Sequence, residues 1–204
     1  MYELNPLVHR SHTLFRSSLG EFQLHAYGMS SGKTHVALVK GNPRASVTPL
    51  VRVQSSCITG TTFLAKLCDC RQQLHLALER IAQHGSGCVV YLDQEGRDHG
   101  LVEKVEQLSL IVGGLDTLAA AQERNKQADL RTYEDAAMIL GELLGKKPLD
   151  MMTNNPEKMD GLAKAGVEVA RRVPIETEPT SDNLDYLFVK RTKMGHLLPG
   201  LDGI

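Results

Sequence analysis

The chain has 204 residues, of which 42% are apolar and 23% are charged, and its formal net charge is -1. These values are typical of a globular protein with its own core, and we expect a single domain over residues 1–204. Tryptophan is absent and aromatic residues make up only 4% of the chain, which argues against a stacking surface for single-stranded nucleic acid. The balanced charge argues against a nucleic-acid polymer as partner, whereas a mononucleotide needs only a few local cations.

Residues 1–16 lack the basic start and the apolar stretch of a secretory signal. No run of the chain approaches the roughly 18 apolar residues that a membrane helix requires. We therefore expect a cytoplasmic protein with no membrane partner. In that compartment cysteines are more often metal ligands or buried thiols than disulfides.

The N-terminal part of the chain has the pattern of a β meander. Gly20 separates the first two predicted strands, and Gly41-Asn42-Pro43 interrupts the chain after the third. The predicted strands are Thr13–Ser17, Glu21–Tyr27, His35–Lys40 and Leu50–Gln54.

From Thr61 onward the apolar spacing becomes that of helices alternating with short strands. A helix containing Leu74, Leu78 and Ile81 ends near Gly85, and the apolar run Cys88–Leu92 predicts a buried strand. The elements expected after it are a helix with Leu101, Val105, Leu108 and Val112 on one face, a helix over Tyr133–Leu144, a strand over Leu149–Met152, a helix from Pro156 capped by Asn155 or Thr153, a strand over Val167–Val173 and a helix over Leu184–Lys193.

This alternation after a β-rich start predicts an α/β fold in which helices flank a mixed sheet. The polar segment Gln94-Glu95-Gly96-Arg97 follows directly after the buried strand Cys88–Leu92. Ligands of open α/β sheets bind at the carboxyl ends of the strands, so this segment is well placed to contact one.

Three cysteines form the most informative cluster of the sequence. Cys57, Cys68 and Cys70 have the spacing C-x10-C-x-C. Thiolates favour zinc, and three protein ligands leave a fourth position for a water that the metal acidifies. The spacing therefore predicts a catalytic zinc site.

Two other interpretations of the cysteines remain open at this level. They are consistent with ordinary buried thiols, or with a structural site closed by a fourth ligand such as His75 or Cys88. The H-x-E and P-C-x-x-C signature of zinc nucleobase deaminases is missing, which argues against that chemistry.

Four cations lie in predicted loops or at strand ends, where a polyphosphate could be bound. Arginine suits bidentate contacts to phosphate, and a triphosphate needs several donors. The alternative is that each is a solvated surface charge. The four are Arg52, Arg97, Arg131 and Lys158.

From about residue 52 to residue 196 the chain resembles the GTP cyclohydrolase II family, the zinc enzymes of riboflavin biosynthesis. The order and spacing of several segments make the resemblance specific. These segments are Arg52-Val53-Gln54-Ser55-Ser56-Cys57-Ile58-Thr59-Gly60, Leu67-Cys68-Asp69-Cys70, Tyr91-Leu92-Asp93-Gln94-Glu95-Gly96-Arg97, Asp116-Thr117, Asp129-Leu130-Arg131-Thr132-Tyr133, Thr153-Asn154-Asn155-Pro156 and Lys193-Met194-Gly195-His196.

The resemblance implies a GTP cyclohydrolase II-like fold and a division of catalytic roles. Zinc on the three cysteines would activate the water that attacks C8 of guanine. Arg131 would attack the α-phosphorus and release pyrophosphate, with Asp129 as base. An arginine is normally protonated, so this role requires a nearby carboxylate.

The resemblance also implies a nucleotide site, Mg2+ with the triphosphate, and a homodimer. The residues expected to contact GTP are Arg52, Val53, Gln54, Ser55, Ser56, Gln73, Glu95, Gly96, Arg97, Thr117, Thr153 and Lys158.

The sequence departs from the family pattern close to the expected chemistry. Gln54 and Ser56 replace the histidine and glutamate of R-V-H-S-E, and His99 replaces the isoleucine of E-G-R-x-I-G-L. The segment of residues 120–126 lacks the asparagine and the L-G-F of A-N-x-x-L-G-F. Leu108 occupies the position of the family's catalytic tyrosine, although it also completes the apolar face of its helix.

These departures leave the product and the substrate open. Without the tyrosine, the second hydrolysis, which frees formate, is expected to fail and to leave a formylated pyrimidine. One alternative function is a divergent paralogue that acts on another purine or pyrimidine nucleotide in a secondary or catabolic pathway. Another is a non-catalytic zinc-binding nucleotide sensor, against which the joint presence of Asp129, Arg131 and Lys158 argues.

Overall fold

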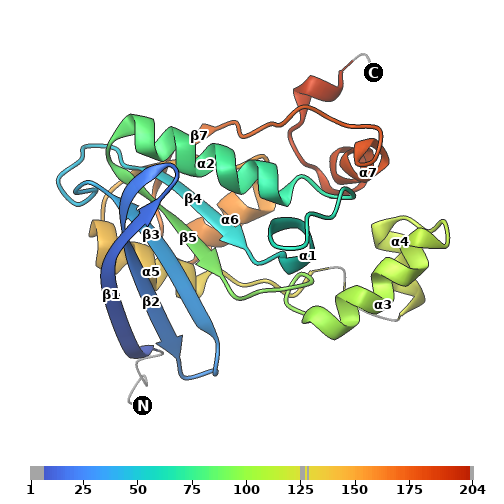
Figure 1. Cartoon of the computed structure of the whole chain (residues 1–204), viewed down its shortest axis with the longest axis horizontal. Helices are drawn as coiled ribbons and strands as arrows, with labels where there is room; N and C mark the ends of the chain where they lie inside the picture. Colours follow the sequence, from blue (N-terminus) through green and yellow to red (C-terminus); the bar gives the residue numbers. More distant parts are fainter. Residues whose placement is uncertain (1–6, 125–126, 128, 203–204) are drawn as a thin grey trace.

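The N-terminal strands form an antiparallel meander at one side of the molecule. In the computed structural model, which describes residues 7–124, 127 and 129–202, β1 (Leu7–Ser17) pairs with β2 (Gly20–Met29), and β2 pairs with β3 (Thr34–Lys40). Gly20 closes the first hairpin at a φ of +111°, which glycine adopts without steric cost. β1 is the edge strand of this meander (Figure 1).

The remaining strands are parallel to one another and extend the same sheet. β5 (Gly87–Leu92) pairs antiparallel with β3 and parallel with β4 (Leu50–Ser55). β4 also pairs with β6 (Leu149–Met152), which pairs with β7 (Val169–Val173). Within the described residues the order is β1-β2-β3-β5-β4-β6-β7 in one seven-stranded sheet. The predicted α/β fold with a mixed sheet and a β-rich N-terminal part is confirmed.

Helices cover both faces of the sheet and create two cores. α2 (Cys70–His84) packs on one face, where Ala77 and Ile81 are completely buried. α5 (Glu134–Leu144) and α6 (Pro156–Lys164) cover the other face (Figure 1). The larger core lies on this second face and includes Tyr27, Val53, Val90, Ile139, Leu140, Met151 and Leu162.

The remaining helical elements gather beyond the carboxyl ends of β4, β5 and β6. They are α1 (Ile58–Thr61), α3 (Leu101–Val112), α4 (Thr117–Glu123), α7 (Leu184–Met194) and the 3-10 turn η1 (Pro199–Leu201). α3 and α4 pack on each other at the side of the molecule opposite the meander (Figure 1). These elements surround the site described below.

The predicted strands and long helices are confirmed, with small differences at their ends. β1 begins six residues earlier than predicted, at Leu7, because its exposed edge carries no alternating pattern that could mark it. The strand expected from Val167 begins at Val169. Asn155 caps α6 by accepting a hydrogen bond from the Glu157 amide at 3.0 Å, which is one of the two predicted caps. The short helices α1 and α4 have no periodic pattern and were not predicted.

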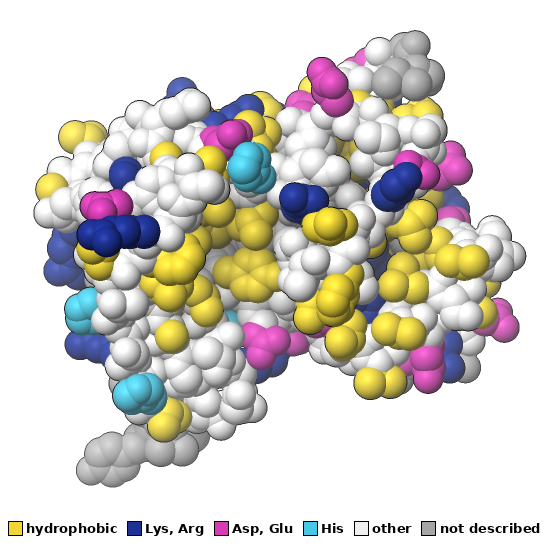
Figure 2. Space-filling view, in the orientation of Figure 1, with side chains coloured by type: hydrophobic (Ala, Val, Ile, Leu, Met, Phe, Trp, Pro, Cys, Tyr) yellow, Lys and Arg dark blue, Asp and Glu magenta, His cyan; other side chains and the backbone are white. Residues whose placement is uncertain are grey.

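The predicted apolar face of α3 exists but is not buried. None of the helix's residues is fully buried, and Val105 and Val112 are 54% and 81% exposed. Hydrophobic side chains are visible over this part of the surface in Figure 2. Asn125 and Lys126, at the end of the segment that departs from the family pattern, lie outside the described residues. Among the described helices, none combines the length and the apolar character needed to cross a bilayer.

The contact between α6 and Tyr133 predicts a position-specific effect of added volume. A Cβ on Gly161 would clash with the Tyr133 ring, whereas a Cβ on Gly141 of α5 would meet nothing within 4 Å. We expect Gly161→Ala to lower the free energy of unfolding by about 1–3 kcal/mol through overpacking. The matched Gly141→Ala variant should raise it by about 0.5–1 kcal/mol through helix propensity. Urea unfolding measures both, and equal effects would contradict the packing described.

Candidate metal centre and nucleotide pocket

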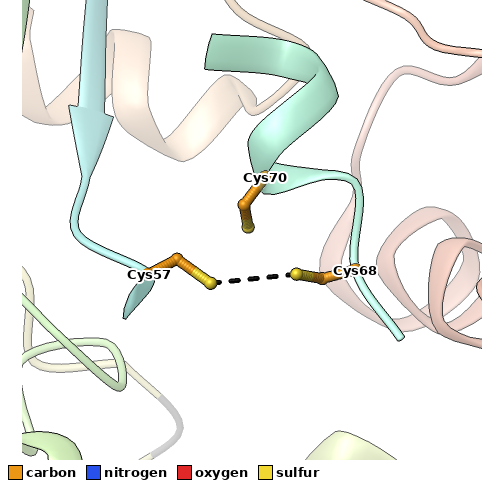
Figure 3. Close-up of side chains that lie close together, drawn as sticks. All are labelled: Cys57, Cys68 and Cys70. Carbon is orange, nitrogen blue, oxygen red and sulfur yellow. Dashed lines mark hydrogen bonds between the residues drawn. The ribbon is translucent and has the colours of Figure 1, made fainter. Parts of the chain in front are cut away.

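The three cysteines converge from separate segments, as predicted. Cys57 follows β4, Cys68 lies in the loop before α2, and Cys70 is the first residue of α2. Their sulfur atoms all lie within 4.8 Å of one another, and Figure 3 shows them pointing toward a common centre. The Sγ atoms of Cys57 and Cys68 are 3.8 Å apart. Hydrogen bonds from Cys68 and Cys70, with help from Lys104, lower the pKa of Cys57 well below its usual range.

The surroundings of the sulfurs fit a metal ion better than a packed thiol cluster. A Cβ on Gly60 would stand 2.7 Å from the Cys68 sulfur and 3.1 Å from the Cys57 sulfur, so glycine leaves room at the centre. Three thiol donors at this spacing match the preference of zinc. Neither suggested fourth ligand joins them: His75 is 59% exposed beside Glu79, and Cys88 is buried inside β5. Among the described residues the group consists of the three cysteines alone.

The cysteines open onto a cavity of about 520 Å³, which is large enough for a nucleotide. It lies at the carboxyl ends of β4, β5 and β6, between α3, α4 and α7. Most of the predicted site residues line it. They are Arg52, Gln54, Ser55, Ser56, Cys57, Cys68, Cys70, Gln73, Gly96, Arg97, Thr117, Arg131, Thr153 and Lys158.

Arg52 is a buried cation whose hydrogen-bond partners, within the described part of the chain, are all neutral. Its guanidinium donates to Gln54 Oε1 at 2.7 and 3.0 Å, to Gln73 Oε1 at 2.7 Å and to the Met152 carbonyl at 2.9 Å. Only 5% of the residue is exposed, and burial lowers the pKa of Arg52 to about 10. Asp69, on the far side of Gln73, partly offsets the effect of burial on that pKa, and an anion in the cavity would add a direct counter-charge.

Lys158 repeats this arrangement from α6. Its Nζ donates to the Val53 carbonyl at 2.7 Å, and the residue is 5% exposed. Burial, and then the neighbouring charges of Arg52 and Arg131, hold the pKa of Lys158 well below its usual range. The interpretation of these cations as solvated surface charges does not apply to Arg52 and Lys158.

A strained turn presents Arg97 to the cavity. Gly96, Arg97 and Asp98 have φ values of +61°, +59° and +72°, a region that residues other than glycine rarely adopt. Lys33 at the β2–β3 turn binds both carboxylate oxygens of Asp98, at 2.6 and 2.7 Å. His99 Nε2 lies 2.8 Å from the Gln127 carbonyl oxygen, so this departure from the family pattern ties the turn to the segment before Asp129.

Asp129 and Arg131 form the close pair that their spacing predicts. The Arg131 Nε donates to both Asp129 oxygens at 2.9 and 3.0 Å, and Nη2 makes a further contact. Burial alone would lower the pKa of Arg131, but the hydrogen bonds to Asp129 outweigh it and raise that pKa. They also outweigh the effect of burial on Asp129, whose pKa is lowered. The pair therefore holds Arg131 protonated in the absence of a ligand.

Three predicted site residues support the cavity without lining it. Val53 is fully buried and offers only its backbone carbonyl, to Lys158. Glu95 accepts the Ile58 amide at 2.7 Å and a Lys104 amine hydrogen bond at 2.6 Å. Asp129 faces Arg131.

Three of the positions that depart from the family pattern, Gln54, Ser56 and Leu108, line the cavity itself. Gln54 binds Arg52, and Ser56 Oγ accepts the Gln94 amide at 3.0 Å. Leu108 lines the cavity, so it does not serve only as the packing residue that periodicity predicts. The Thr117 hydroxyl is buried and has no hydrogen-bond partner among the described residues, which leaves it available to a ligand.

Several residues of the site were not predicted. Asp69, between two of the cysteines, accepts Lys190 Nζ at 2.7 Å and Gln73 Nε2 at 2.6 Å. Lys104, Tyr186 and Lys190 also line the cavity. Their signal in the sequence is weak, because lysines and a tyrosine on short helices are usually surface residues.

The chain matches the family model described as GTP cyclohydrolase II over residues 9–174. This chain belongs to the GTP cyclohydrolase II family. It is 45% identical over 183 residues to the riboflavin biosynthesis protein RibBA of Chlorobium phaeovibrioides, which covers 89% of this chain and 44% of that protein. It is 42% identical over 168 residues to the GTP cyclohydrolase-2 of Buchnera aphidicola subsp. Schizaphis graminum, which covers 82% of this chain and 85% of that protein.

The chain thus spans about half the length of the RibBA proteins that it matches and most of the shorter GTP cyclohydrolase-2. RibBA of Bacillus subtilis is likewise matched over part of its length: it is 40% identical over 97% of this chain and 50% of that protein. One similar solved structure is that of RibBX of A. baumannii, described as a two-domain 3,4-dihydroxy-2-butanone 4-phosphate synthase. The match covers 85% of this chain and 41% of that chain, at 18% sequence identity and a TM-score of 0.49. The family resemblance inferred from the sequence is confirmed.

The environment of His196 predicts a pH effect on stability. Burial, and then Lys190, lower the pKa of His196 from 6.5 to about 4. Between these pH values the unfolded chain binds more protons than the folded chain. The free energy of unfolding is therefore unaffected by protonation of His196 above about pH 6.5 and decreases as the pH falls toward 4. Relative to His196→Gln, the wild-type protein should lose about 2 kcal/mol of its free energy of unfolding between pH 7 and pH 5. Urea unfolding at both pH values measures this difference, and parallel pH dependence of the two proteins would contradict it.

Proposed function

We propose that this chain opens the imidazole ring of GTP by zinc-dependent hydrolysis and releases pyrophosphate, giving a diaminopyrimidine ribosyl phosphate. The single observation that carries the proposal is one cavity in which a three-thiol metal centre faces the buried cations Arg52 and Lys158. A purine nucleoside triphosphate requires both features, one for its ring and one for its phosphates. Membership of the GTP cyclohydrolase II family supports the same reaction.

Bound zinc would act as a Lewis acid that activates a water for attack at C8 of the guanine. Cys57, Cys68 and Cys70 would hold the ion and leave its fourth position facing the cavity. Thr117 offers a free hydroxyl to the nucleotide. Gly96 lines the cavity in a turn that requires glycine, because a Cβ there would stand 2.6 Å from the Gly100 carbonyl oxygen.

The cations would bind and orient the triphosphate. Arg52 and Lys158 are held in place by neutral acceptors, so their charges remain available to phosphate oxygens. Arg97 reaches the cavity from the strained turn, and Arg131 from the adjacent segment, whose Leu130 amide donates to the Arg97 carbonyl at 3.2 Å. Mg2+ would accompany the triphosphate and neutralise the remaining charge.

Arg131 and Asp129 would carry out the release of pyrophosphate. In the free protein their ion pair keeps the proton on Arg131. For Arg131 to attack the α-phosphorus, Asp129 must accept that proton as the guanidinium turns toward the phosphate. The P–N bond that forms as pyrophosphate leaves would then be hydrolysed by water, which frees the monophosphate and restores Arg131. The bidentate contact places this base within hydrogen-bond distance, which is the geometric requirement for general-base assistance.

The riboflavin pathway is the better supported role for this activity. The similar proteins are named for riboflavin biosynthesis or as GTP cyclohydrolase-2, and none of the relatives reported above is named for another nucleotide. The divergent paralogue and the non-catalytic sensor have no such support. We also propose that the protein is cytoplasmic, forms a homodimer and binds a nucleotide as its small-molecule partner.

Leu108 gives a specific reason to expect slow release of formate. Its side chain lines the cavity at the position of the family's tyrosine and has no hydrogen-bonding group. We propose that the first hydrolysis proceeds and that a share of the product retains the formyl group. Loss of a positioned catalytic group commonly lowers a rate by about 10² to 10⁴.

The phosphoryl role of Arg131 can be tested with purified, zinc-loaded protein, GTP and Mg2+. We expect pyrophosphate release to fall by about 10² or more in Arg131→Ala. The matched control is Arg171→Ala, which removes an arginine whose side chain is 70% exposed and pairs with Asp150. Wild-type pyrophosphate release by Arg131→Ala would exclude the nucleophilic role, and the absence of any turnover of GTP by the wild-type protein would contradict the proposed function.

The product depends on position 108 in this proposal. We expect Leu108→Tyr to raise the deformylated share of the product, because the phenol restores a hydrogen-bonding group. Mass spectrometry and a formate assay measure this share. Val105→Tyr, at a position of α3 that is 54% exposed, is the control and should leave the product unchanged. A fully deformylated product from the wild-type protein would contradict this part of the proposal.

A further inference from the structure

Lys104 on α3 contacts the metal centre directly. Its Nζ lies 3.2 Å from the Cys57 sulfur and 2.6 Å from Glu95 Oε1. The side chains of Lys104 and Glu95 are only 17% and 11% exposed, so this is a shielded ion pair rather than a surface one.

Lys104 is linked to Cys57 in two ways, directly through the sulfur and indirectly through Glu95. Glu95 uses its second oxygen to accept the amide of Ile58 at 2.7 Å. Ile58 directly follows Cys57 in the chain. The lysine therefore holds both the sulfur of Cys57 and, through Glu95, the backbone beside it.

The charge of the centre explains why a cation is useful at this point. Three thiolates around one divalent ion leave a net negative charge, which opposes both the acidification of a bound water and the approach of a polyanionic nucleotide. A lysine ammonium in contact with one thiolate offsets that charge, and hydrogen bonds to ligands are known to orient them and tune the metal.

The position of Lys104 on α3 also connects the centre to the cavity wall. None of the residues of α3 is fully buried, so few apolar contacts fix this helix to the rest of the molecule. Lys104 and Leu108 are one helical turn apart and both line the cavity. The contacts of Lys104 therefore also set where α3 presents Leu108.

We propose that Lys104 is a positioning residue of the metal centre, which offsets the negative charge of the three thiolates and fixes Cys57 through its sulfur and through Glu95. This inference rests on the proposed zinc site. It is independent of which nucleotide is the substrate and of which product is formed.

The test measures metal binding in the whole chain with three substitutions. Lys104→Met removes the charge and the donor, Lys104→Gln removes the charge but keeps a donor, and Lys104→Arg keeps both. Lys164→Met, at an exposed position of α6, is the control. Zinc affinity is measured by competition with a chromophoric chelator, and cobalt loading reports thiolate coordination through its charge-transfer absorption.

We expect zinc affinity to fall about 10- to 100-fold in Lys104→Met and in Lys104→Gln. Lys104→Arg and the control should stay close to the wild-type protein. The cobalt charge-transfer bands should shift in the Met and Gln variants, because Cys57 loses its hydrogen-bonded cation. Circular dichroism of the metal-free proteins shows whether each variant is folded. If Lys104→Met is unfolded, the comparison between Lys104→Gln and the wild-type protein decides the outcome.

Wild-type zinc affinity and cobalt spectrum in both Lys104→Met and Lys104→Gln would overturn the inference. Wild-type behaviour of Lys104→Gln alone would overturn the role of the charge. These outcomes differ from a failure of the proposed function, in which the wild-type protein binds no zinc or does not turn over GTP.

Discussion

The parallel pairing of β4 with β5 is the constraint on which the site depends. The register sets Gln54 opposite Tyr91 and Ser55 opposite Leu92, so the two strands end side by side. The Ser56 amide then bonds the Leu92 carbonyl at 2.8 Å, which brings the turn at Cys57 beside the turn at Glu95. A one-residue shift of β4 would turn Arg52 and Gln54 to the other face of the sheet and would separate these turns.

Charge is distributed unevenly around the resulting cavity. Three thiols lie at one wall, while Arg52 and Lys158 are buried nearby and, among the described residues, hydrogen-bond only to neutral acceptors. Burying a cation without a counter-charge costs free energy, which the protein offsets with neutral acceptors. A bound triphosphate would supply the counter-charge, so the strain of the free protein favours an anionic ligand.

The rigid sheet and the surrounding helices contribute differently to this site. β4, β5 and β6 are buried. β4 carries Arg52, and the turn that holds Cys57 follows directly after it. α3 has no fully buried residue and reaches the metal centre through Lys104. The helix that bears the departure at Leu108 is thus held by polar contacts more than by packing.

The sequence by itself determined the strands, the long helices, the cysteine cluster and the family, because periodic apolar patterns and fixed motif spacings are local properties. It did not reveal α1 and α4, which are too short for a period, or the exposed edge strand's first residues. Only the tertiary structure decided that Arg52 and Lys158 are buried beside each other, and that Lys104 reaches Cys57 from 47 residues away. Burial and long-range contacts depend on how elements pack, and no spacing along the chain encodes them.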